Sequence, residues 1–230
     1  GVQTCALPIS GHPGTTNRLE TLAKLKHRRD TTLPYSLYRL RTLEAALSQY
    51  SEQGPEQRRQ AGTDLHRVAN ARKAMSGQLQ GLLDPKIMEA KEKSELDLQS
   101  HLELPVKPVQ PDPKAAWRTM EQLQEKLRGY EKDYFLLERG DSFFTEYFAI
   151  ARHLVRLAHE LPKKSGDRLR EYRDSNLESL KFQLFSPAPI EPALERLKLQ
   201  TSLTFLAENL GTVTVDEIGR ASCRERVSSP

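Results

Sequence analysis

Cysteine is the scarcest of the chemically versatile residues in this 230-residue chain. It occurs twice, as Cys5 and Cys223, one near each end. The long stretch between them therefore has no disulfide framework, no thiolate nucleophile and no cysteine ligand for a metal ion. Cysteine usage consequently gives no indication of the redox compartment.

Both ends carry sequences that translated sequencing adapters would produce. Residues 1–9 (GVQTCALPI) are what the codons GGA GTT CAG ACG TGT GCT CTT CCG ATC encode, and these codons resemble a common short-read adapter. Residues 217–227 (EIGRASCRERV) resemble the translated partner adapter. Including the junction residues, we predict that residues 1–10 and 217–230 are adapter and exclude them from the fold. The alternative is that they are ordinary flexible termini.

An excess of charge of one sign is nearly absent as well. The net charge of +4 falls to +3 when the three arginines and two glutamates of residues 217–230 are removed. Acidic and basic residues alternate along most of the chain, which is typical of a solvated helical surface. The one concentrated basic run, residues 24–29 (KLKHRR), has no interleaved aromatics. It therefore favours a solvated face or linker over a nucleic-acid arm, and we expect no nucleic-acid partner.

Long apolar runs are missing too. None approaches the roughly 18 to 20 residues that a membrane-spanning helix needs, and no signal peptide is recognisable. We expect no membrane partner. If the chain is an internal piece of a longer protein, a signal peptide would lie outside it.

The common catalytic motifs are absent: there is no G-x-S-x-G elbow, no H-E-x-x-H and no glycine-rich phosphate loop. The Gly140-Asp141-Ser142 triplet is similar to a serine-protease nucleophile loop, but Phe143 follows where a glycine is needed, so a helix cap is favoured. His153 and His159 lie six residues apart and face different sides of a helix. We therefore expect no metal site and no cofactor. Aromatic residues 143–148 are more typical of a core than of a ligand site.

Apolar residues recur at spacings of three and four from Thr31 onward, the period of an amphipathic helix. The pattern predicts one helix that begins near Thr31, Thr32 and Pro34 and is stopped by Gly54 and Pro55, and a second that carries 65–82. A third begins at Asp84–Pro85, and another at Asp112–Pro113 after the proline-rich connector 104–113. Further helices are expected from Asp141 or Ser142 to Pro162, over 167–185, and over 192–210, where Gly211 is the expected C-terminal cap. Their predicted stripes include Leu37, Leu40, Leu43 and Leu47; Leu65, Val68, Arg72 and Met75; Trp117, Leu123 and Tyr134; and Phe144, Tyr147, Leu154 and Leu161.

Short loops place such helices side by side, so the predicted fold class is mainly α, an antiparallel helical bundle. Two short segments depart from this pattern: residues 11–17 are rich in glycine, proline and threonine, and residues 212–215 (TVTV) are β-branched. A helical unit with β-prone ends suggests an insertion in another domain. The expected division is 11–30 as the end of a preceding domain with a linker, 31–211 as the helical domain, and 212–216 as the return.

Asn70 is the one candidate binding residue that the helical pattern singles out. At about 100° per residue, it points almost opposite to the stripe that includes Val68 and Met75. His66, Lys73, Gly77 and Gly81 share or flank its side. Each glycine costs a helix roughly 1 kcal/mol relative to alanine, which indicates a close approach by something else. A plain solvated face is the alternative.

Four segments in this order resemble the chymotrypsin-like dipeptidyl-peptidases of Gram-negative bacteria, the family of dipeptidyl-peptidases 7 and 11 and dipeptidyl aminopeptidase BII. They are GHPGTTNR at 11–18, RVANARKAMSGQLQGL at 67–82, RLREYRDSNLESL at 168–180 and FSPAPI at 185–190. The resemblance spans residues 11–216. It implies a helical domain inserted in a double β-barrel serine peptidase, where it caps the active-site cleft. The catalytic histidine and aspartate would precede Gly11, and the serine would follow Asp216.

The resemblance also implies a function and a site. The family removes dipeptides from free peptide N-termini by serine, histidine and aspartate chemistry, and an asparagine of the helical domain helps to bind the substrate α-amino group. Asn70 is the position that aligns with it. Implied partners are a peptide substrate, the β-barrel halves of the same chain and a second copy in a homodimer. The implied location is the periplasm or the exterior of the cell. A non-catalytic helical scaffold that binds other proteins is the alternative function.

Overall fold

The computed structural model describes residues 19–101, 113–138 and 143–210, and every regular element in these ranges is helical. The mainly α prediction is confirmed. The α-helices are α1 (Leu22–His27), α2 (Leu33–Ser51), α3 (Pro55–Leu83), α4 (Pro85–His101), α5 (Pro113–Asp133), α6 (Glu146–Glu160), α7 (Asp174–Leu184) and α8 (Pro192–Leu210). Two π-helical segments, η1 (Arg28–Thr32) and η2 (Tyr134–Glu138), and two 3₁₀ turns, η3 (Ser165–Asp167) and η4 (Arg170–Tyr172), complete the described elements.

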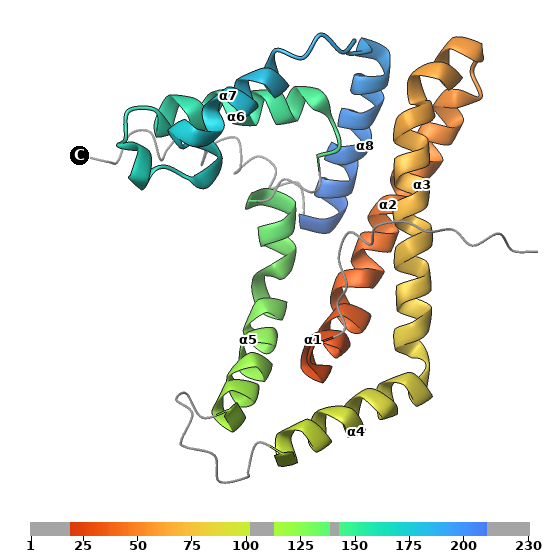
Figure 1. Cartoon of the computed structure of the whole chain (residues 1–230). Helices are drawn as coiled ribbons and strands as arrows, with labels where there is room; N and C mark the ends of the chain where they lie inside the picture. The colour runs from red at the N-terminus through yellow and green to blue at the C-terminus, as the bar shows by residue number, and fades with distance from the viewer. Residues whose placement is uncertain (1–18, 102–112, 139–142, 211–230) are drawn as a thin grey trace, which may run out of the picture.

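An antiparallel hairpin of α2 and α3 forms the centre of the fold (Figure 1). The predicted stripe of α2 is buried, and its leucines pack against Ala61 and Val68 of α3. Gly54 and Pro55 separate the two helices, as the sequence predicts, because proline fits a first helical turn. The seam between the two helices holds most of the larger core cluster.

Helix α8 packs beside α2 and links this core to a second, smaller one. Leu194 joins the first cluster, whereas Phe205 and Leu206, farther along α8, pack with Leu136 of η2. The Phe205 ring also contacts Tyr35 of α2, with ring centroids 5.6 Å apart. One helix therefore connects the α2–α3 hairpin to the end of α5.

The first helix begins earlier than predicted. It starts at Leu22, where the Thr21 hydroxyl accepts a hydrogen bond from the backbone N–H of Lys24 at 3.3 Å, and not at Thr31 to Pro34. The chain then stays helical through the π-helical segment η1, in which the Leu33 N–H donates to the Arg28 carbonyl five residues earlier. Proline cannot continue a regular α-helical ladder, so a wider turn just before Pro34 lets the helix proceed. Residues 22–30, expected to be a linker, are thus helical.

Helices α4 and α5 flank α1 at the end of the hairpin that is farthest from the α2–α3 loop (Figure 1). Asp84 separates α3 from α4, and its carboxylate accepts from the Lys86 N–H at 2.9 Å, as the Asp84–Pro85 signal predicts. Helix α5 runs beside α1. The connector between α4 and α5, residues 102–112, lies outside the described residues.

The start of α6 corrects another prediction. Its N-cap is Thr145, whose hydroxyl accepts from the Phe148 N–H at 2.9 Å, and not Asp141 or Ser142, which lie outside the described residues. Phe144 consequently precedes the helix. Tyr147, Leu154 and Leu161, predicted to be buried, are largely exposed because α6 contacts α8 only in part.

The predicted helix over 167–185 is also wrong in its first third. Two 3₁₀ turns occupy residues 165–172, and only α7 is α-helical. The guanidinium of Arg168 explains the irregular backbone, because it donates to the carbonyls of Leu161 and Lys163 and to the Asp174 carboxylate at 2.6 Å. These bonds satisfy carbonyl groups that a regular helix would otherwise use.

The β-prone segments 11–17 and 212–215 and the predicted C-cap Gly211 lie outside the described residues, so their expected conformations stay predictions.

Leu47 provides a test of the α2–α3 seam. Its side chain is 1% exposed, so Leu47→Ala should lower the free energy of unfolding by about 3 kcal/mol through lost burial and a residual cavity. Leu98→Ala on α4, where the leucine is 50% exposed, is the matched control and should change it by less than about 0.5 kcal/mol. Urea unfolding followed by circular dichroism measures both, and equal losses would contradict the assignment of the core.

Candidate functional site

Asn70 lies in the middle of α3 on the side that faces away from α2. Its neighbours Val68, Leu65 and Met75 pack into the core on the opposite side, whereas Asn70 is exposed. Within the described part of the chain its side-chain amide has no hydrogen-bond partner. The predicted orientation is therefore confirmed, and the amide is accessible to a ligand.

The other residues on or beside this α3 face are His66, Lys73 and two glycines. The His66 ring lies back on its own helix, with Nδ1 2.7 Å from the Gly62 carbonyl oxygen, and Lys73 is exposed. A methyl group added at Gly77 or Gly81 would meet nothing within 4 Å. The close approach that these glycines indicate is thus not made by any described residue, and the face is open.

A buried charged network anchors α3 one and a half turns before Asn70. Asp64 of α3 accepts from the Lys198 ammonium of α8 at 2.9 Å, and Lys198 also pairs with Glu195 one turn earlier in α8. The side chains of Lys198 and Glu195 are only 5% and 3% exposed. Glu195 in turn accepts from the Glu146 N–H at the first turn of α6, at 2.7 Å. One network therefore joins α3, α8 and α6.

The charges of this network are mutually compensated. Burial disfavours the ammonium form of Lys198, but its hydrogen bonds to Glu195 and Asp64 outweigh burial and raise its pKa above the ordinary value. Glu195 gains further stabilisation because a carboxylate at a helix N-terminus faces the positive end of the helix dipole. The Lys198 ammonium can therefore stay ionised inside the fold.

Phe144 occupies the corner between α3 and α8. The Arg67 guanidinium lies 4.7 Å from the ring centroid and the Lys198 ammonium 5.3 Å from it, which are cation–π distances. Next to it, Phe143 stacks on Phe148 at 3.8 Å. The aromatic residues at 143–148 thus mainly pack the junction of α6 and α8, in agreement with the core interpretation.

The basic run 24–29 is largely neutralised. Lys24 and Arg28 both pair with Glu20, and Arg29 pairs with Asp30. His27 is buried, with its Nε2 2.6 Å from a carboxylate oxygen of Glu131 in α5. Within the run, His27 thus lies in the α1–α5 contact, while the paired cations around it do not form a continuous basic surface.

The His27–Glu131 pair borders a cavity that the sequence did not indicate. The Thr32 hydroxyl donates to the second Glu131 oxygen at 2.8 Å. The cavity has a volume of about 390 Å³ and lies between α2, α3 and α5, with Tyr35, Met75 and Phe135 among its lining residues.

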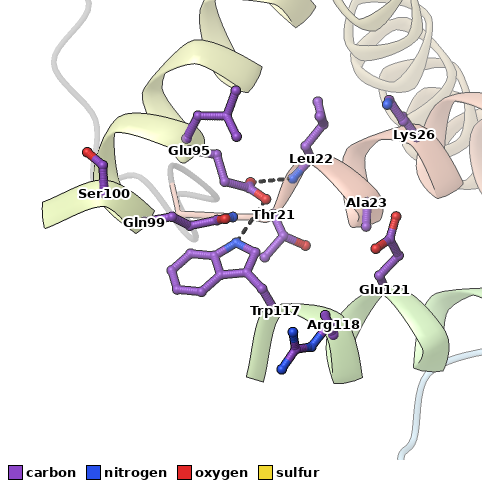
Figure 2. A pocket seen from close by; sticks show the side chains of 11 residues that line it. Thr21, Leu22, Ala23, Lys26, Glu95, Gln99, Ser100, Trp117, Arg118 and Glu121 are labelled. Carbon is purple, nitrogen blue, oxygen red and sulfur yellow. Dashed lines mark hydrogen bonds between the residues drawn. The ribbon is translucent and has the colours of Figure 1, made fainter. Parts of the chain in front are cut away.

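A second cavity, of about 440 Å³, lies where α1, α4 and α5 meet (Figure 2). Glu95 is at its centre: one carboxylate oxygen accepts from the Leu22 N–H at 2.6 Å and the other from the Trp117 indole N–H at 2.8 Å. Figure 2 shows Lys26 and Glu121 on the wall formed by α1 and α5. Both Glu95 oxygens already accept hydrogen bonds from the protein itself, so this site is a structural junction of three helices.

His153 and His159 do not converge on a common site. His153 Nδ1 lies 3.0 Å from the hydroxyl of Tyr172, which is fully buried. Within the residues described, no three histidine, cysteine or acidic side chains are grouped so that they could hold a metal ion. Likewise, no described helix is long and apolar enough to cross a membrane.

A comparison with models of protein families identifies the family of the chain. A model of the peptidase S46 family matches residues 6–227. The chain belongs to peptidase family S46. This is the family of dipeptidyl-peptidases 7 and 11, which are serine peptidases. Neither the comparison with curated proteins nor that with solved structures gave a match. The S46 match extends into both ends assigned above to adapters, and that assignment stays a prediction.

The segments that carry the S46 resemblance have different places in the structure. Segment 67–82 is the middle of α3 and contains Asn70. Segment 168–180 contains the 3₁₀ turn η4 and the first part of α7. Besides the Arg168 bonds, the Leu169 N–H donates to Glu160 of α6 at 2.8 Å and the Asn176 amide to the Arg170 carbonyl at 2.6 Å. Segment 185–190 is largely exposed, and 11–18 lies outside the described residues.

Acidification should weaken this turn region through His153. Burial, with a smaller contribution from the Arg152 cation, lowers the pKa of His153 below its ordinary 6.5. The unfolded chain therefore binds the proton more readily, so His153 favours the folded state above pH 6.5 and this contribution is lost as the pH falls below it. We expect His153→Gln to reduce the loss of stability between about pH 7 and pH 5, measured by urea unfolding. An identical pH dependence in the variant would contradict this.

Proposed function

We propose that this chain is the helical domain of an S46 dipeptidyl-peptidase, that it caps the active-site cleft of a double β-barrel peptidase domain, and that Asn70 binds the α-amino group of the substrate. Membership of family S46 supports the activity and the serine mechanism. The wholly helical architecture of the described residues is compatible with an inserted cap. In this proposal the catalytic triad comes from the β-barrels, before Gly11 and after Asp216. The family resemblance also supports a periplasmic or secreted location.

The observation that carries the Asn70 assignment is an accessible amide in the middle of an exposed helical face that also carries two glycines. The Asn70 carbonyl oxygen can accept a hydrogen bond from a substrate ammonium group. Its neutrality avoids an uncompensated charge when the cleft is empty. Arg67 and Lys73, each one turn away, would repel an ammonium group. The charge of Arg67 is balanced by Asp64 at 2.9 Å, and Lys73 is exposed to solvent, which screens its charge. The immediate electrostatic surroundings are thus compatible with an amino-terminal ligand.

Holding the amino group at a fixed place would explain why such an enzyme releases dipeptides. Two extended residues span about 7 Å, so an amino-group site at that distance from the nucleophilic serine places the second peptide bond at the reacting position. The serine, with histidine as general base, then forms the acyl-enzyme and releases the shortened peptide; water releases the dipeptide. The role of α3 would be to set this distance. Family membership favours this enzyme over a non-catalytic scaffold.

Replacing Asn70 tests the amino-group role directly. In the full-length peptidase, Asn70→Ala should raise KM for dipeptidyl substrates by roughly tenfold or more, because a hydrogen bond to a charged group is worth about 1.5–3 kcal/mol. Gln80→Ala is the control, since it removes another exposed amide three turns farther along α3. Steady-state kinetics with a dipeptidyl reporter substrate measures both. An unchanged KM in Asn70→Ala would defeat the assignment.

The glycines of the α3 face allow a second test. In the described structure a side chain at Gly77 has open space, so Gly77→Leu should keep or raise stability, by up to about 1 kcal/mol. If the substrate or a β-barrel approaches α3 there, the same change should lower kcat/KM severalfold. Gly129→Leu on α5 is matched, because Gly129 is also helical and has equally open surroundings. Equal activity of the two variants would contradict a close approach at Gly77.

A further inference from the structure

The charged network of Asp64, Lys198 and Glu195 controls the rotation of α3 about its own axis, and the position of Asn70 depends on that rotation. Asn70 points away from its helix's own core, so its position is set by the rotation of α3 and not by packing around its side chain. Side chains extend to about 5–6 Å from a helix axis, and a rotation of about 10° therefore moves a group such as the Asn70 amide by roughly 1 Å. Displacements of this size are large for substrate positioning.

The seam with α2 fixes α3 against that one helix only. Its α3 side consists of aliphatic side chains such as Ala61, Val68 and Met75, flanked by the ion pair of Arg72 with Glu44. The Asp64 carboxylate meets the Lys198 ammonium of α8 at 2.9 Å, with side chains 16% and 5% exposed, so a change in geometry breaks a specific bond between α3 and α8. Asp64 precedes Asn70 by about 9 Å along the helix axis.

The other end of the network is equally fixed. Lys198 is held by Glu195, which also binds the first turn of α6, and by the Phe144 ring beside it. The Phe144 N–H donates to the Ser202 hydroxyl at 3.2 Å, and that hydroxyl donates to the Lys198 carbonyl at 2.7 Å. Lys198 thus presents its ammonium to Asp64 from a rigid corner formed by α8 and the start of α6.

We infer that Asp64 and Lys198 are positioning residues for substrate binding: their ion pair fixes the rotation of α3 against α8 and α6 and so places Asn70 for the substrate amino group. This inference rests on the proposed function of Asn70. Neither residue touches the substrate. Their contribution is to KM through Asn70, and the peptidase chemistry itself does not depend on them.

The sharpest test uses Asp64→Asn in the full-length peptidase. This nearly isosteric change removes the charge on α3 and leaves Lys198 paired with Glu195, so the α6–α8 corner is kept. Because it also removes the partner of Arg67, each variant is compared in an Arg67→Gln background, in which that cation is absent. We expect KM to rise roughly fivefold with kcat changed less than about twofold. Asp64→Glu, which keeps the charge, should restore much of the loss. The matched control is Asp30→Asn, which breaks the ion pair with Arg29 within η1 and does not involve α3, so it should leave KM unchanged.

A double-mutant cycle separates positioning from general weakening of the fold. In an Asn70→Ala background, Asp64→Asn should have no further effect on KM, because the group that it positions is gone. Equal, additive effects with and without Asn70 would overturn the inference, as would an unchanged KM in Asp64→Asn when Asn70→Ala alone raises it. An unchanged KM in Asn70→Ala itself sinks the proposed amino-group role and the inference with it. If Asp64→Asn does not fold, Lys198→Met enters the same cycle with the same criteria.

Discussion

The apolar seam between α2 and α3 is the constraint on which the rest of the structure depends. It buries one side of a 29-residue helix along much of its length and leaves the opposite side without a described neighbour. A helix held on one side only can present functional groups on the other, because packing and exposure are separated by half a turn. Asn70 and the two glycines occupy that open side.

Buried ionisable side chains join several of the other helices to this seam or to one another. Lys198 with Asp64 and Glu195 joins α8 and α6 to α3, and His27 with Glu131 joins α1 to α5. Such pairs add little net stability, since desolvation offsets much of their attraction, but their geometry is more specific than that of aliphatic contacts. In this protein they occur where two helices contact each other through only a few residues. At such contacts the orientation of the helices depends more on directional bonds than on the buried area.

Sequence reasoning succeeded where one physical signal dominates. Proline and glycine at 54–55, Asp84 with Pro85, and the uninterrupted helical period over 192–210 gave correct boundaries because they act locally. It failed where distant groups decide. The start of the first helix depends on a π-helical turn that accommodates Pro34, and the turn at 165–172 depends on Arg168 binding carbonyls up to seven residues away. Glu195, Lys198 and Ser202 fall on the buried side of α8, yet their polarity made them resemble solvated residues.

Glu95 and the His27–Glu131 pair have a mechanical consequence for the lower half of the molecule. Together they close a ring of helices, in which α2 leads through α3, α4 and α5 back to α1 and so to α2 again. In a closed ring no corner can bend by itself, since a change of angle between α3 and α4 must be matched by sliding of α5 along α1. The helices of this ring, α1 to α5, are therefore mechanically linked, and a displacement imposed on one of them is shared among all of them.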